Sequence, residues 1–200
     1  MPENPETVRR RILVIDDNRE IHEDFRKIFQ PTPASASALA ESEAVLFGES
    51  PEQTPQPQFQ VDFASQGAEG AARVGPAREQ SKPYALAFVD MRMPPGWDGI
   101  ETTARIWELD PAVQVVICTA YSDHSWEDVR RKLGHSDRLV ILKKPFDNIE
   151  VLQLASALTE KWHLAEVAKR RLQHLEGLVE QHTTELQAAR ARLKTSGEQS

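Results

Sequence analysis

Residues 11–18 read RILVIDDN, four apolar residues between an arginine and two aspartates. The apolar run is too short for a helix and rich in β-branched residues, which predicts a buried strand. Residues 84–89, 113–118 and 138–142 form similar runs, and residues 59–64 alternate apolar and polar side chains as a strand does. Helical patterns separate these strands, and the helix after residues 59–64 is expected to break at Gly75 and Pro76. The sequence therefore predicts an α/β fold, a doubly wound sheet of five parallel strands.

Polar side chains follow four of the predicted strands. They are Asp16 and Asp17, Asp90, Thr119 and Lys144. Ligands of open parallel sheets bind beyond the carboxyl ends of the strands, so these groups should meet in one crevice. Three carboxylates repel one another unless a cation lies among them, and hard oxygen ligands with open positions suit Mg²⁺. The hydroxyl and the ammonium can hold phosphoryl oxygens, which leaves Asp90 as the nucleophile.

Four motifs in this order resemble the receiver domains of bacterial two-component response regulators. They are RILVIDDN at 11–18, FVDMRMPPGWDG at 88–99, VICTA at 116–120 and LKKPFD at 142–147. The resemblance covers about residues 10–157 without an insertion at 31–58. It implies a flavodoxin-like fold, Mg²⁺ as cofactor, and phosphotransfer from a sensor histidine kinase or phosphotransfer protein to Asp90.

The resemblance also implies a role for each site residue. Asp17 should bind Mg²⁺ directly and Asp16 mainly through water, while Asp90 is both phosphoacceptor and metal ligand. The remaining roles fall to Arg92, which offers its backbone carbonyl to the metal, to Thr119 and Lys144, which bind phosphoryl oxygens, and to Pro145, which follows a cis peptide bond. Output is expected through the face made by the helix at 125–133, the strand at 138–142 and the helix that starts at Asn148.

Several features depart from the family pattern. Residues 93–99 form a loop one residue longer than usual, and Ile141 stands where the family has an aromatic switch residue. Residues 31–58 are rich in Pro, Ala, Ser, Glu and Gln and predict an insertion or linker. Arg92 and Tyr121 are large residues beside the approach of a hydrolytic water, which predicts slow self-dephosphorylation.

The sequence predicts one long helix from Asn148 with an apolar seam at alternating spacings of three and four, the pattern of a coiled coil. Lys161 and His182 interrupt this seam. We therefore expect a parallel homodimer with three regions per chain: a flexible N-terminus at 1–10, the receiver at 11–157 and a coiled-coil extension at 158–200. The seam comprises Val151, Leu154, Leu158, Ala165, Ala168, Leu172, Leu175, Val179, Leu186, Ala189 and Leu193.

Composition excludes several classes of function. The formal net charge of −7 disfavours nucleic acids and anionic membranes as partners. Cys118 is the only cysteine, so no intrachain disulfide forms, and a cytoplasmic location is expected. No apolar run is long enough to span a membrane, and the polar first residues do not resemble a signal peptide. The six histidines, His22 among them, are expected to be exposed.

Three alternatives to a self-contained, non-enzymatic switch are compatible with parts of the sequence. The chain could be the front end of a longer hybrid histidine kinase or a cyclic-di-GMP cyclase or phosphodiesterase, because residues 175–186 resemble helical linkers in such proteins. A haloacid-dehalogenase-type phosphohydrolase normally has an acid two residues after its nucleophile, where this chain has Arg92. A flavodoxin needs a phosphate loop after the first strand, where Asp16 and Asp17 would repel the phosphate.

Overall fold

A computed structural model describes residues 10–29, 59–120, 126–134 and 136–197. Five strands alternate with the helices in these ranges. The strands are β1 (Arg10–Ile15), β2 (Phe59–Ala64), β3 (Leu86–Asp90), β4 (Gln114–Thr119) and β5 (Leu139–Lys143). The helices are α1 (Arg19–Phe29), α3 (Gly67–Glu79), α4 (Gly99–Leu109), α5 (Trp126–Leu133) and α6 (Asn148–Gly197).

The sheet is entirely parallel, with strand order β2-β1-β3-β4-β5. The first crossover leads outward to β2 and the next returns past β1 to β3, so the strand order reverses between β1 and β3. This topology confirms the predicted doubly wound fold. It also places the carboxyl ends of β1 and β3, and so the residues after them, next to each other.

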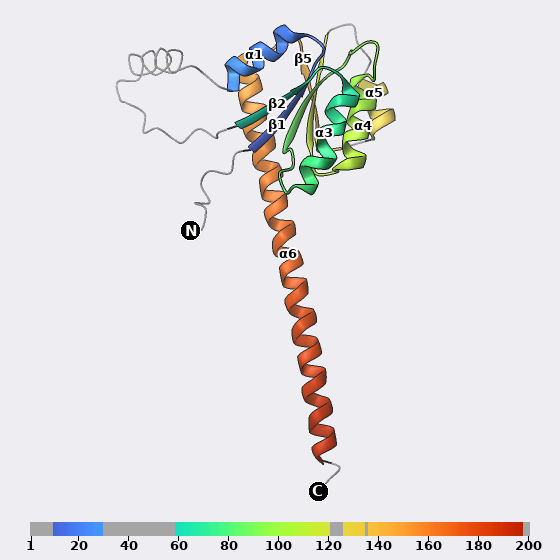
Figure 1. Cartoon of the computed structure of the whole chain (residues 1–200), viewed down its shortest axis with the longest axis vertical. Coiled ribbons are helices and arrows are strands. Elements are labelled where there is room, and N and C mark those ends of the chain that lie inside the picture. The colour runs from blue at the N-terminus through green and yellow to red at the C-terminus, as the bar shows by residue number, and fades with distance from the viewer. Residues whose placement is uncertain (1–9, 30–58, 121–125, 135, 198–200) are drawn as a thin grey trace, which may run out of the picture. The chain divides into compact units, whose positions relative to one another are not determined.

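Alternating side chains of the strands supply two separate hydrophobic cores. Leu13 and Ile15 of β1 pack with α3, α4 and α5, whereas Ile12 and Val14 pack with α1 and the first part of α6. Figure 1 shows one layer of helices on each side of the sheet. Because β1, β3 and β4 are covered on both faces, their residues are apolar without alternation, as the sequence showed.

The structure corrects the expected break of the second predicted helix at Gly75–Pro76. Helix α3 continues through Pro76 to Glu79. Proline removes one helical hydrogen bond, but the carbonyl of Pro76 still accepts from the N–H of Gln80 at 3.0 Å. Val74 and Ala77, on either side of the proline, are buried in the core. Their packing stabilises the last turn of the helix.

A polar cluster joins β1, β2 and the segment just before β3. Arg11 of β1 forms an ion pair with Asp62 of β2, and its guanidinium also lies over the ring of Tyr84, 4.2 Å from the centroid. The Tyr84 hydroxyl donates to Asp62 at 2.8 Å and accepts from Arg11 at 2.9 Å. Burial, followed by the hydrogen bond to Asp62, raises the pKa of Tyr84 to about 12. Opposite charges are thus paired within the cluster, although the Nε of Arg11 is buried without a hydrogen-bond partner among the described residues.

Arg10, the last residue of the N-terminal segment 1–10 expected to be flexible, is instead the first residue of β1 and part of the folded sheet. Its guanidinium donates to the hydroxyl of Thr159 at 3.2 Å and forms an ion pair with Glu160. Lys161 likewise pairs with Asp137 at 2.8 Å. These contacts attach the middle turns of α6 to both β1 and the turn before β5.

The expected coiled-coil seam starts within the folded unit. Val151 is 0% exposed and Leu158 and Trp162 are each 8% exposed, because they pack against the rest of the domain. The seam therefore cannot begin at Val151. The chain divides into two compact units, Met1–Trp162 and His163–Ser200, so the packed unit extends five residues past 157.

Within the described ranges, no helix is long and apolar enough to cross a membrane. The expected insertion at 31–58, the N-terminal residues 1–9, and Tyr121 lie outside the described residues.

Candidate functional site

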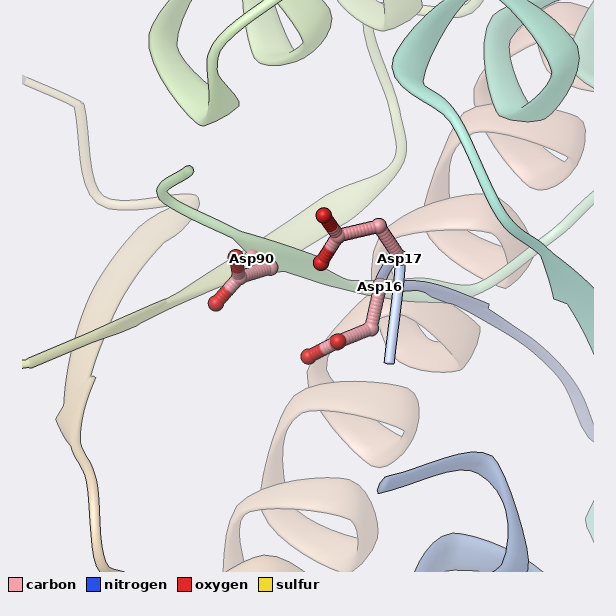
Figure 2. A group of neighbouring side chains, drawn as sticks. All are labelled: Asp16, Asp17 and Asp90. Atoms are coloured by element: carbon pink, nitrogen blue, oxygen red, sulfur yellow. The ribbon is translucent and has the colours of Figure 1, made fainter. Parts of the chain in front are cut away.

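Three carboxylates meet at the carboxyl ends of β1 and β3. Asp16 and Asp17 follow β1 directly and Asp90 is the last residue of β3 (Figure 2). One oxygen of each lies within 4.8 Å of the others. Asp16 is buried, Asp90 is half-buried and Asp17 is exposed. The strand order thus brings together three of the residues that were expected to share one crevice.

Lys144 provides the positive charge of this cluster. It follows β5, and its ammonium donates to Asp16 at 2.7 Å and to Asp90 at 2.6 Å. Its backbone N–H donates to the carbonyl of Thr119 at 2.8 Å, which continues the β4–β5 ladder by one residue. That ladder delivers the lysine to aspartates that are 128 and 54 residues away in the sequence.

The environment opposes the charge on Asp90 more than Lys144 supports it. Burial raises the pKa of Asp90, and the charge of Asp16 adds to this, while the hydrogen bond and charge of Lys144 act in the opposite direction. Burial alone would lower the pKa of Lys144, but hydrogen bonds to Asp16 and Asp90 raise it overall. Three carboxylates around one ammonium leave an excess of negative charge, which a cation can offset.

Backbone groups fix the position of Asp90. The N–H of Arg92 donates to its second carboxylate oxygen at 3.0 Å. Helix α4 starts very close to Asp90. A Cβ atom added to Gly99 would lie only 2.6 Å from the carbonyl oxygen of Asp90. Asp98 caps this helix by accepting from the N–H of Glu101 at 2.7 Å. A residue larger than glycine at position 99 would displace the backbone that carries Asp90.

Two further predicted site residues are Thr119 and Arg92, which lie at the end of β4 and just after β3. Thr119 ends β4, and its hydroxyl donates to the carbonyl of Ala120 at 3.1 Å. The N–H of Arg92 contacts Asp90, and the metal contact expected for its carbonyl remains a prediction. The Lys144–Pro145 bond is cis, as the family resemblance implied, and the Pro94–Pro95 bond in the longer loop is cis as well.

The donor set fits Mg²⁺. Carboxylate oxygens are the hard ligands this ion prefers, and three of them lie within 4.8 Å of one another. The exposed position of Asp17 leaves room for water and a phosphoryl oxygen beside the metal. Asp16, Asp17 and Asp90 are therefore the side chains that could hold the ion.

Two further residues differ from expectation or from the family pattern. His22 was expected to be exposed, but it is 6% exposed and its ring lies 5.0 Å from that of Phe63. The helical pattern of α1 could have indicated this, since His22 is three residues before Phe25 on the buried face. Ile141, at the switch position, is partly buried against the core formed with α3, α4 and α5.

Comparisons with known proteins agree with this geometry. A family model described as response regulator receiver domain matches residues 52–156, just over half of the chain. The match begins after β1, so Asp16 and Asp17 lie outside it, and the sheet alone brings them to Asp90. No curated protein matches the chain.

Solved structures share the fold at low sequence identity. Adenylate cyclase from Rhodopirellula baltica has a TM-score of 0.58 at 18% identity, covering 83% of this chain and 98% of that one. The signal receiver domain of an HD domain-containing protein from Pseudomonas fluorescens matches with a TM-score of 0.56 and 18% sequence identity, and the match again covers 83% of this chain and 98% of that one. A CheY-like response regulator receiver domain protein from Methanospirillum hungatei matches with a TM-score of 0.54 and 18% sequence identity. This match covers 78% of this chain and 98% of that one.

Proposed function

Because the chain belongs to the response regulator receiver domain family, we propose that it accepts a phosphoryl group on Asp90 in a two-component phosphorelay. The observation that carries this proposal is the cluster of three carboxylates within 4.8 Å, two of them bridged by Lys144. The donor would be a phosphohistidine of a sensor histidine kinase or phosphotransfer protein. In this proposal the chain acts as a phosphoacceptor switch.

In the transfer, a carboxylate oxygen of Asp90 attacks phosphorus. A P–O bond forms while the P–N bond to the donor imidazole breaks, and the imidazole nitrogen keeps the electron pair and takes a proton from solvent. Lys144, already within hydrogen-bond distance of Asp90, can turn its ammonium to the phosphoryl oxygens. The Thr119 hydroxyl would hold another of these oxygens.

Mg²⁺ would be held directly by the carboxylates of Asp17 and Asp90 and by the backbone carbonyl of Arg92. Asp16 would contact the ion mainly through water. A bound ion supplies positive charge that offsets both the carboxylates and the incoming phosphoryl oxygens. The chain's own residues do the rest. The N–H of Arg92 and the close approach of Gly99 hold Asp90 in place.

Arg92 and Tyr121 are proposed to slow hydrolysis of the acyl phosphate by obstructing the in-line water. Output would pass through the face formed by α5, β5 and α6 and through the C-terminal helix, and we include a homodimer in the proposal. An open pocket at this face supports its use as a docking surface. It is lined by Ile141, Leu142, Lys143, Pro145 and Glu150.

Intact-mass measurement after incubation with Mg²⁺ and acetyl phosphate tests the function. The wild-type chain should gain the mass of one phosphoryl group, and EDTA should prevent the gain. Asp90→Asn should gain none, because an amide cannot form the acyl phosphate.

Asp24→Asn is the matched control, since it removes the same charge from an exposed ion pair with Lys27 on α1. This variant should gain mass as the wild type does. A mass gain that persists in Asp90→Asn would show that another residue is the nucleophile.

A second candidate is that this receiver is the N-terminal module of a longer hybrid kinase, cyclase or phosphodiesterase. Two of the similar structures favour it, since they are described as an adenylate cyclase and as the receiver of an HD domain-containing protein. The length of the complete reading frame would decide between the two candidates.

A further inference from the structure

The helix α6 has two stretches whose apolar residues differ in burial. Up to Trp162 they are buried in the folded unit, as Val151 at 0% and Leu158 at 8% illustrate. In the unit from His163 onward they are exposed: Leu172 is 59%, Leu175 55%, Val179 66% and Leu186 64% exposed. The second stretch presents an apolar stripe that needs a partner.

The exposed residues follow a heptad repeat. Leu172, Val179 and Leu186 occupy successive a positions, and Leu175 and His182 occupy d positions. Leu164 and Leu178, 59% and 37% exposed, lie beside this seam at g positions. A repeat of 3.5 residues is the pattern by which helices wind around each other. At one layer, Val179 at a follows Leu175 at d, the combination that favours two strands.

We propose that residues 164–186 pair with the same segment of a second copy as a parallel, in-register coiled coil that begins only after Trp162. The four seam residues Leu172, Leu175, Val179 and Leu186 of each chain would leave water together. Their burial provides the driving force against the entropy lost on association. This proposal specifies the homodimer that forms part of the proposed function.

His182 favours the parallel direction. In an antiparallel pair each d residue faces an a residue of the second copy, and here the a residues are Leu172, Val179 and Leu186. The polar ring, whose Nδ1 lies 3.3 Å from Glu185, would then face an apolar side chain. In the parallel pair His182 faces His182, and the apolar layers remain apolar.

Two unpaired charges favour the in-register alignment. Arg171 at g faces the e residue five positions later in the second copy, which is Glu176. Among the described residues neither takes part in an ion pair within its own chain. In-register parallel pairing joins them twice, once on each side of the seam, and a shift by one heptad would separate them.

The pairing joins the two receivers to the same end of the coiled coil, since each receiver precedes its helix in the chain. Because the seam begins after the packed turns of α6, the dimer should form with or without phosphorylation of Asp90. Phosphorylation can then change the geometry of the pair while the pair itself persists.

Cysteine cross-linking on the full-length chain tests direction and register together. Native Cys118 should stay silent, because it is 2% exposed and burial raises its pKa to about 12. With oxidised glutathione as oxidant, Leu175→Cys should form a covalent dimer in most of the protein. Gln173→Cys, at an outer b position, should stay monomeric on a denaturing gel.

Charge exchange provides the variant that leaves the apolar seam intact. Arg171→Glu or Glu176→Arg alone should raise the dimer dissociation constant on the order of threefold to tenfold, and the double variant should return it close to wild type. Both measurements should give the same result in Asp90→Asn, so failure of phosphorylation and failure of pairing can be told apart. A monomeric wild-type chain in light scattering at tens of micromolar would overturn the proposal, as would a dimer in which Leu175→Cys fails to cross-link.

Discussion

Charged side chains gather at both ends of the same sheet, but the two clusters are built in opposite ways. At the carboxyl end, Asp16 and Asp90 share the ammonium of Lys144, and Asp17 adds a third carboxylate beside them. Toward the amino end, the carboxylate of Asp62 is matched by Arg11 and by the hydroxyl of Tyr84.

The two clusters therefore have different roles: the paired charges stabilise the fold, and the unpaired carboxylates form a binding site. Matched, half-buried charges stabilise the fold, because each charge that leaves water is paired with one of opposite sign. Unmatched carboxylates destabilise it until a cation binds, so their presence indicates a site. Removing a carboxylate should therefore have opposite effects on stability at the two ends of the sheet.

The largest expected effect is that of Asp62→Asn. The change leaves the Arg11 guanidinium, whose side chain is 18% exposed, without its anionic partner. We expect a loss of about 2 kcal/mol in the free energy of unfolding, or roughly 4–8 °C in Tm for a chain of this size. Urea unfolding measures it, with Asp24→Asn as control, which should stay within about 0.5 kcal/mol of wild type. Equal losses in the two variants would refute the matched cluster.

Asp90→Asn should act in the opposite direction. In EDTA the change removes one of three neighbouring carboxylates and leaves Lys144 bonded to Asp16. We expect stability to rise by about 1 kcal/mol, or roughly 2–4 °C in Tm. Adding Mg²⁺ should raise the Tm of wild type more than that of the variant. Thermal melts with and without the ion give both results, and a lower Tm of the variant in EDTA would contradict the comparison.

Tyr84→Phe tests the amino-end cluster through pH. The loss of two hydrogen bonds should cost about 1 kcal/mol near pH 8. Because the pKa of Tyr84 is raised to about 12, its neutral form is favoured in the folded state, so its contribution is full below pH 10 and is lost as pH rises through 12. The difference between wild type and variant in urea unfolding should shrink over that range. A difference that grows would mean that the sign is wrong.

The smallest effect is expected for Arg10→Met, which keeps an apolar stem and removes the contacts with Thr159 and Glu160. Glu160 is 47% exposed, so water screens the pair and the cost should be about 0.5 kcal/mol. Unfolding at low salt and at 1 M NaCl checks this, because the difference should vanish at high salt. A difference that persists at high salt would point to packing as its cause.

The sequence alone determined the parallel α/β fold and the meeting of Asp16, Asp17 and Asp90. Both follow from local pattern: short apolar runs form buried strands, and polar residues at their ends lie at one edge of a parallel sheet. The sequence also predicts a helix over 99–109 that Asp110–Pro111 closes, and α4 has these bounds. The cap at its start, Asp98, is seen only in the structure. The cis peptide bond before Pro145 was predicted from the family resemblance and not from the local sequence pattern.

Tertiary structure decided what periodicity leaves open. Pro76 stays inside α3 because Val74 and Ala77 are held in the core, which a local rule about proline does not weigh. The heptad pattern of α6 runs through both stretches alike, yet Val151 and Leu158 are covered by the sheet while Leu172 and Leu175 are exposed. A repeat shows that one face of a helix is apolar, whereas only the packed chain shows which surface covers it.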